Sequence, residues 1–261
     1  MIDFHNHLMP GVDDGAGDLD ESRKALRTLH EQGIRGLVTT PHLQGSLTER
    51  PEAYGEYLGK LDAAWEELRS LASQEMPDLR LERGVEVMLD TPTPDVSDPR
   101  VRLAGTSFVL VEFPYMTVPP NSAATIFGMK MQGWNPVIAH PERYGGVDDA
   151  LEVVEEWRRV GGFLQVNCGS LLGRYGEKQK ETAWRLLRRG WVDYLSSDYH
   201  ARGRCPVAEA RAKLEEKGGV EQARLLMEVN PGRLLAGQPP EAVPPLVRER
   251  RSLLSRILNR R

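Results

Sequence analysis

Histidine and carboxylate residues recur in this sequence at spacings that suit metal coordination. His5 and His7 are separated by one residue, and Asp198 and His200 repeat that spacing near the other end of the chain. On an extended strand alternate side chains point to the same face, so the two members of each pair lie beside each other. Because imidazoles and carboxylates together bind divalent transition metals, both pairs predict a metal site.

The complete set of candidate ligands is larger than one cation requires. It comprises His5, His7, Asp14, His42, Glu86, Glu112, His140, Asp198 and His200. We therefore expect two or three divalent ions, bridged by a carboxylate and sharing a water molecule or hydroxide. No cysteine belongs to the set, which disfavours a structural zinc site. Asp13 could cap the loop while Asp14 serves as the ligand, and His30 is interpreted as an ordinary helix residue.

Short β-type runs alternate with amphipathic helical runs, and the candidate ligands fall at the ends of the β-type runs. Strands are predicted at 2–5, 36–40, 79–89, 107–112, 136–139, 163–167 and 194–197. Helices are predicted at 18–32, 49–73, 122–132, 148–160, 177–189, 207–217, 220–228 and from 245 to the end. This alternation predicts parallel strands joined by crossover helices, and about seven such units fit a closed barrel. Functional residues of a parallel barrel collect where its strands end, as these do.

Composition narrows the classes of protein to which the chain could belong. It has 261 residues and a net charge of −4, which argues against a generic nucleic-acid binder. No apolar run approaches the roughly 18 residues of a membrane span, and the N-terminus lacks the layout of a signal peptide. The two cysteines, Cys168 and Cys205, make no disulfide framework, so the cytoplasm is expected. We expect one domain over residues 1–240 and a tail over 241–261.

The tail differs from the rest of the chain in charge. Residues 248–261 hold six arginines and one glutamate, a net charge of +5 that leaves −9 for residues 1–247. The apolar residues of this segment recur at helical spacing, which predicts an amphipathic helix with a basic side. Such a helix could dock on an anionic membrane surface at the inner face or on a partner protein. Packing on its own barrel or on another subunit is the alternative, and it is favoured.

The motifs together resemble the PHP (polymerase and histidinol phosphatase) superfamily, and more narrowly its bacterial CpsB/CapC branch of capsule and exopolysaccharide biosynthesis. The matching segments are DFHNHLMPGVDDG, TTPHL, GVEVM, VEFP, AHPERY, SSDYHA and, at the end, NPGRLLAG, and they run from residue 2 to about residue 236. The resemblance implies a distorted (β/α)7 TIM-like barrel with three divalent metals, most often manganese, with Fe²⁺, Zn²⁺ or Mg²⁺ as alternatives. It also implies phosphatase activity on phosphotyrosine proteins, typically the autophosphorylated tyrosine kinase that controls polysaccharide export.

The resemblance also implies roles for single residues. The first metal would be held by His5, His7, Glu86 and Asp198, the second by Asp14, His42 and His200, and the third by Glu112 and His140 with Glu86 bridging. Arg143 matches a phosphate-binding arginine of the family. A second such arginine corresponds to Arg204 or, as the weaker candidate, to Arg202. A guanidinium fork suits phosphate recognition.

The expected reaction is hydrolysis of a phosphate monoester by direct attack of metal-activated hydroxide, with no phosphoenzyme intermediate. Metal ligands and arginines would neutralise the phosphoryl oxygens, and a tyrosyl leaving group needs little acid assistance. The nearest competing function is a small-molecule phosphatase of the histidinol-phosphate type, which more often has histidine at the position of Asp14. A metal-dependent nuclease or polymerase-associated module and an inactive binding module are more distant candidates. Oligomeric state is left open.

Overall fold

The computed structural model describes residues 1–147 and 150–247, in which short strands alternate with helices. The strands are β1 (Ile2–Asp3), β2 (Gly36–Thr39), β3 (His42–Gln44), β4 (Arg80–Arg83), β5 (Glu86–Met88), β6 (Phe108–Glu112), β7 (Asn135–Ala139), β8 (Phe163–Asn167) and β9 (Tyr194–Ser196). The helices are α1 (Leu19–Glu31), α2 (Pro51–Glu75), α3 (Ser122–Met131), α4 (Glu152–Arg159), α5 (Cys168–Leu171), α6 (Glu177–Arg189), α7 (Val207–Glu216), α8 (Val220–Arg224) and α9 (Asn230–Leu235). The α/β class expected from the sequence is confirmed.

The strands pair in parallel and form two sheets, ordered β1-β2-β4 and β3-β5-β6-β7-β8-β9. The chain passes from the first sheet to the second twice, between β2 and β3 and between β4 and β5. The single strand predicted over 79–89 is therefore two strands in two sheets. A Cβ atom at Gly84 would lie 3.1 Å from the Leu103 Cα, so glycine permits the close backbone approach at this break.

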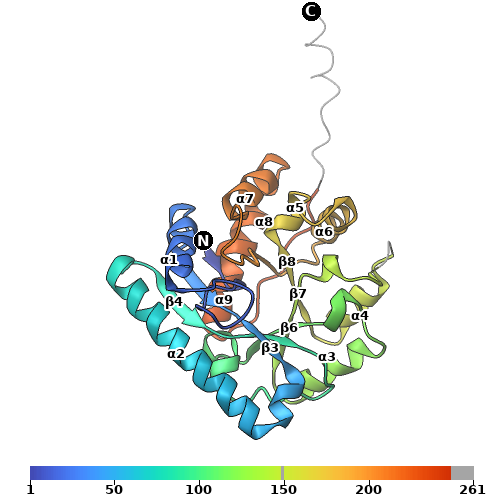
Figure 1. The fold of residues 1–261 in the computed structure, drawn as a ribbon. Helices are drawn as coiled ribbons and strands as arrows, with labels where there is room; N and C mark the ends of the chain where they lie inside the picture. Colours follow the sequence, from blue (N-terminus) through green and yellow to red (C-terminus); the bar gives the residue numbers. More distant parts are fainter. Residues whose placement is uncertain (148–149, 248–261) are drawn as a thin grey trace, which may run out of the picture.

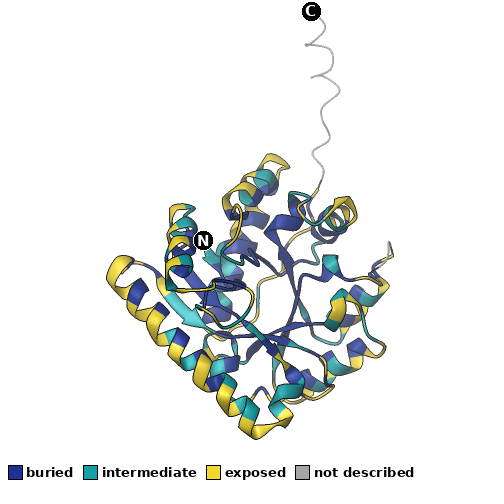
Figure 2. Ribbon diagram, in the orientation of Figure 1, coloured by how far each residue is buried: buried dark blue, intermediate teal, exposed yellow. Residues whose placement is uncertain are grey.

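Helices surround the strands, which lie at the centre of the molecule (Figure 1). The strands are buried along most of their length, while exposed residues follow the outer sides of the helices (Figure 2). Aromatic residues fill the interior: Phe4 and Tyr194 are fully buried, and their rings meet edge to face at 5.0 Å. Burying an apolar side chain of this size contributes about 1.5–3 kcal/mol. This core fixes the strand ends that carry the candidate ligands.

Several boundaries differ from the prediction. The helix expected at 148–160 begins at Glu152, and its expected first residues, 148–149, lie outside the described residues. Residues 245–247 are not helical, and the remainder of the predicted tail helix, 248–261, also lies outside them. The short strand β3 and the short helix α5 are not predicted from the sequence, whereas α9 lies within NPGRLLAG, the segment that resembles the family's closing helix. Within the described parts of the chain, every helix is too short or too polar to cross a membrane.

Candidate metal centre

The nine predicted ligands converge in one cluster, and six of them lie at or just after the carboxyl end of a strand. His5 and His7 follow β1, Asp14 lies before α1, His42 and Glu86 begin β3 and β5, Glu112 ends β6, His140 follows β7, and Asp198 and His200 follow β9. Six of them are buried: His5, His7, Glu86, Glu112, His140 and Asp198. Asp14 is exposed, and His42 and His200 are half-buried, so the cluster opens to solvent on one side.

Glu86 is the centre of the cluster. Its Oε2 lies 3.1 Å from His5 Nε2, 3.5 Å from His7 Nε2 and 3.2 Å from His42 Nδ1. Its Oε1 lies 3.0 Å from His140 Nε2. Both oxygens of one carboxylate thus face imidazole nitrogens of four histidines from three separate segments of the chain. This geometry fits a carboxylate that bridges two cations.

Asp198, from the opposite end of the chain, faces two of the same histidines and also His200. Its Oδ1 lies 3.5 Å from His5 Nε2, 3.4 Å from His7 Nε2 and 3.6 Å from His200 Nδ1. The one-residue spacing therefore directs His5 and His7 to a shared centre, as predicted. Asp198 has a backbone φ of 52° and His140 one of 35°. Left-handed backbone at such residues costs of order 1–3 kcal/mol and is concentrated at functional sites.

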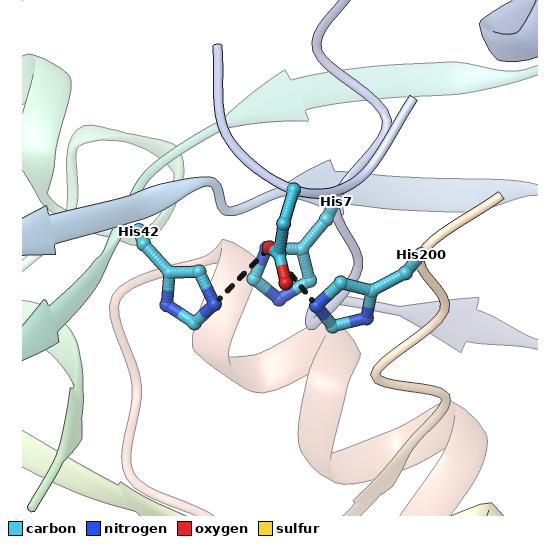
Figure 3. Close-up of side chains that lie close together, drawn as sticks. His7, His42 and His200 are labelled. Carbon is cyan, nitrogen blue, oxygen red and sulfur yellow. Dashed lines mark ion pairs between the residues drawn. The ribbon is translucent and has the colours of Figure 1, made fainter. Parts of the chain in front are cut away.

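Asp14 closes the outer side of the cluster. Its Oδ1 lies 3.6 Å from His42 Nε2 and 3.5 Å from His200 Nε2. The His7 ring stacks on the His200 ring with their centroids 3.9 Å apart, and Figure 3 shows His7, His42 and His200 gathered at one point. The carboxylate and the three histidines are placed so that each can offer one ligand atom to the same ion.

Asp13 has a different role from its neighbour. Its Oδ2 lies 2.6 Å from His7 Nδ1 and accepts a hydrogen bond from the His42 backbone N–H at 3.0 Å. Asp13 therefore holds the His7 ring and the backbone at His42, while Asp14 faces the His42 and His200 rings. Gly15 makes this tight loop possible, because a Cβ atom there would lie 2.0 Å from the His7 carbonyl oxygen.

These residues form four overlapping groups, and within each group the ligand atoms lie within 4.8 Å of one another. They are His7, Asp14, His42 and His200; His5, His140 and Asp198; His5, His7 and Glu86; and His42, Glu86 and Glu112. The structure thus pairs Glu112 with His42 more closely than with His140, at 3.1 Å against 3.9 Å. The assignment of ligands to individual ions that the resemblance implied differs from these groups, whereas the nine residues themselves are the same.

Buried ligand atoms of the cluster lack hydrogen bonds. Within the described part of the chain, His5 Nε2, His7 Nε2, His42 Nδ1, Glu86 Oε2 and Glu112 Oε1 are buried without such a partner. Leaving a buried polar group unsatisfied costs roughly 1–3 kcal/mol, and more when the group is charged. Five such atoms in one place, all nitrogen or carboxylate oxygen, fit divalent cations as their missing partners.

Charge in the cluster shifts the pKa values of its members. Burial lowers the pKa of His5, but Glu86 and Asp198 outweigh that effect and raise it to about 9. Burial raises the pKa of Asp13, but the hydrogen bond with His7 outweighs it and lowers the pKa to about 2. For Glu86 burial is likewise outweighed, by the charge of His5, and its pKa falls well below its usual range. The carboxylates therefore attract cations strongly.

The three candidate phosphate-binding arginines are placed differently. Arg143 donates from Nη1 to Asp198 Oδ2 at 2.8 Å and lies 4.3 Å above the Tyr175 ring. Arg202 donates to the Gly15 carbonyl oxygen at 3.4 Å. The Arg204 side chain is 81% exposed and lies 4.0 Å from Glu209. Arg143 is therefore in direct contact with the cluster, and Arg202 reaches the loop that carries Asp14.

His30 lies apart from the cluster, as predicted, in a half-buried position on α1, and pairs at 3.0 Å with the exposed Asp78. Sequence reasoning missed Gln165 and Asn167, two buried amides at the carboxyl end of β8 that contact His5 and Asp198. The signal that could have found them is their spacing. They alternate on one strand, as His5 and His7 do, and so share a face.

The Capsular polysaccharide synthesis, CpsB/CapC family model matches residues 1–236. The tyrosine-protein phosphatase YwqE of Bacillus subtilis is 31% identical over 258 residues, covering 97% of this chain and 98% of YwqE. The tyrosine-protein phosphatase CpsB of Streptococcus pneumoniae is 28% identical, covering 91% of this chain and 99% of CpsB.

Solved structures agree with the sequence matches. One from work on YwqE and CpsB, described there as metal-dependent tyrosine phosphatases, superposes with a TM-score of 0.79 at 29% identity and covers 95% of this chain and all of its own. Histidinol phosphate phosphatase from Lactococcus lactis has a TM-score of 0.52 at 15% identity, over 85% of this chain and 93% of its own, and shares the fold alone. On the family match and these relatives, the chain belongs to the CpsB/CapC family of capsular polysaccharide synthesis.

Proposed function

We propose that this chain is a metal-dependent protein-tyrosine phosphatase that hydrolyses phosphotyrosine on a protein substrate. Its relatives are named tyrosine-protein phosphatases, and they match it over nearly their whole length. The observation that carries the proposal is the contact of Glu86 with four histidines, beside ligand atoms that are buried without hydrogen bonds. Such a cluster suits hydrolysis of phosphate esters.

The nine cluster residues would hold the cations, and bound cations would activate water and neutralise charge on the phosphoryl oxygens. We propose three cations, with Mn²⁺ the expected occupant. Arg143 lies beside the cluster with its side chain 23% exposed, so its guanidinium can reach a phosphate in the open side of the site. A fixed guanidinium fork binds phosphate oxygens and stabilises charge that develops on them. Arg202 and Arg204 are candidates for a second such contact.

The two cysteines are protonated thiols at neutral pH and so are poorly suited to accept a phosphoryl group, which fits its direct transfer to water. Burial raises the pKa of Cys168 well above its usual range, and it raises that of Cys205 to about 12. Both thiols therefore stay protonated at neutral pH and are poor nucleophiles. Trapping of a covalent phosphoprotein during turnover would contradict transfer to water.

The test is the turnover of a phosphotyrosine peptide and of histidinol phosphate by protein stripped with a chelator and then reloaded with Mn²⁺. We expect the peptide to be hydrolysed only after reloading, and histidinol phosphate to be the poorer substrate. Preference for histidinol phosphate would favour a small-molecule phosphatase. Absence of turnover with Mn²⁺ bound would favour an inactive binding module.

The remaining parts of the proposal concern architecture and location. We propose that the two parallel sheets belong to one distorted (β/α)7 barrel, because the Asn6–Tyr199 bridge joins the segments after β1 and β9. The substrate would be the tyrosine kinase that controls polysaccharide export, at the inner face of the membrane. Liposome binding by the full chain, compared with a chain ending at residue 245, tests whether the basic tail contributes to that location.

A further inference from the structure

A chain of hydrogen bonds crosses β8 beneath the cluster. Gln165 Oε1 lies 2.7 Å from His5 Nδ1, and Gln165 Nε2 donates to Asn167 Oδ1 at 2.9 Å. Asn167 Nδ2 then donates to Asp198 Oδ2 at 2.6 Å. These four side chains are buried, with Gln165 and Asn167 fully so. Two neutral amides thus connect two candidate ligands, His5 and Asp198, that lie at opposite ends of the sequence.

The Asp198 carboxylate determines which group donates and which accepts in each of these hydrogen bonds. A carboxylate only accepts hydrogen bonds, so Asn167 must present its amide nitrogen to Asp198. The Asn167 oxygen then faces Gln165 and accepts from its nitrogen, which turns the Gln165 oxygen toward His5. An oxygen there requires a donor, so the His5 Nδ1 carries the proton.

This order of donors and acceptors determines which nitrogen of His5 is free. With the proton on Nδ1, the neutral ring keeps its lone pair on Nε2. That nitrogen is buried without a hydrogen-bond partner in the described chain, and it faces Glu86 Oε2 at 3.1 Å and Asp198 Oδ1 at 3.5 Å. At Asp198, Oδ2 is bound by Asn167 and Arg143, which leaves Oδ1 directed at the histidines.

We propose that Gln165 and Asn167 are positioning residues that fix the ring of His5 and the carboxylate of Asp198 for cation binding. The proposal rests on the metal site of the proposed function. Asn167 also keeps Oδ2 of Asp198 hydrogen-bonded when the Arg143 guanidinium turns toward a phosphate. Partners that orient metal ligands in this way typically change metal affinity by 10–100-fold when they are removed.

The test is a calorimetric titration of the full chain with Mn²⁺ in wild type, Gln165→Leu, Asn167→Leu and Gln165→Glu. Both leucine variants should bind Mn²⁺ about 10–100-fold more weakly. Gln165→Glu should recover only part of that loss, because its carboxylate still accepts from the His5 Nδ1–H but cannot donate to Asn167 Oδ1. Asparagine and leucine are both uncharged, so a loss in Asn167→Leu cannot arise from a change in net charge.

The matched control is Gln222→Leu, which removes another buried amide, one that donates to the Pro244 and Pro245 carbonyl oxygens away from the cluster. It should lower the unfolding temperature measured in chelator and leave Mn²⁺ affinity unchanged. Wild-type affinity in both leucine variants would overturn the positioning role. A comparable loss of Mn²⁺ affinity in Gln222→Leu would also overturn it, because the loss would then reflect a general decrease in stability. Failure of the wild type to bind Mn²⁺ would overturn the proposed function itself.

Discussion

Two buried aspartates flank strand β9, and only one of them belongs to the cluster. Asp193 precedes the strand and is 8% exposed, while Asp198 follows it and is 7% exposed. Asp193 accepts from the Leu164 backbone N–H at 2.8 Å and from Arg158 at 3.2 Å. Asp198 instead faces His5, His7 and His200 and is held by Arg143 and Asn167.

The difference appears in the pKa values of the two carboxyls. Burial raises the pKa of Asp193 to about 6, because Arg158 only partly compensates for lost hydration. For Asp198 the same burial is outweighed, first by His5 and then by His7, and its pKa falls well below its usual range. Equal burial on one strand therefore gives opposite outcomes. The surrounding imidazoles, and not burial alone, distinguish a cation site from a structural carboxylate.

The strongest way to break this comparison is to remove each aspartate in turn. Asp198→Ala should lower phosphatase activity by several hundredfold or more and abolish Mn²⁺ binding at one position. The variant lacks the carboxylate that would bind cations together with His5, His7 and His200. Asp193→Asn should retain both properties. Steady-state assays and Mn²⁺ titration of the two variants measure this contrast, and equal loss in both would remove the distinction.

The arginines that pair with the two aspartates offer the next contrast. Arg143→Ala should retain Mn²⁺ and raise KM for a phosphotyrosine peptide about 10–100-fold, because a charged hydrogen bond contributes roughly 1.5–3 kcal/mol. Arg158→Ala, the matched control at Asp193, should leave KM unchanged. Metal loss in Arg143→Ala would show instead that this arginine serves only to hold Asp198.

The pH dependence of Mn²⁺ affinity sharpens the comparison further. In the metal-free protein the pKa of His5 is about 9, so near pH 7 the ring is protonated and a bound cation must displace that proton. Affinity should rise about tenfold per pH unit for each proton displaced, between pH 6.5 and 8.5. Titrations in buffers of different ionisation enthalpy measure the protons released, and affinity that does not change with pH would contradict the shift.

The smallest expected effect concerns stability at Asp193. Its folded pKa of about 6 lies above the roughly 3.9 of an unfolded aspartate, so the folded state binds this proton more tightly. The stabilisation is complete below pH 4 and is lost as pH rises through 6. The free energy of unfolding of wild type, relative to Asp193→Asn, should thus fall by about 2 kcal/mol from pH 4 to pH 7. An unchanged difference would contradict the raised pKa.

Sequence patterns predicted which side chains gather in space better than they predicted the bounds of the strands that carry them. All nine predicted ligands gather in one cluster, because residues at the carboxyl ends of parallel strands meet at one face. The break between β4 and β5 was missed, since alternation continues through Gly84 and only the close approach of Leu103 reveals it. The sequence favoured Arg204 over Arg202, although both follow the strand end. In the structure Arg202 donates to the Gly15 carbonyl oxygen near Asp14, whereas Arg204 is 81% exposed, and only loop geometry separates their directions.

The hydrogen-bonded amides show a second limit of sequence reasoning. Gln165 and Asn167 are neutral and common residue types, so no motif marks them as partners of His5 and Asp198. Their role depends on contacts between residues far apart in the chain: Gln165 lies 160 positions from His5, and Asn167 lies 31 positions from Asp198. Asp13 and Asp14 are a second example of this limit, because their side chains are chemically identical. Only the folded loop directs Asp13 toward His7 Nδ1 and Asp14 toward His42 and His200.

The most direct test of the central claim is the stoichiometry of Mn²⁺ binding to wild type, Asp198→Ala and Asp193→Asn, measured by calorimetry and metal analysis of the same samples. We predict more than one bound ion in wild type and Asp193→Asn, and at least one fewer in Asp198→Ala. One ion or none in wild type, or the same number in all three proteins, would contradict a multi-cation centre at the carboxyl ends of the strands.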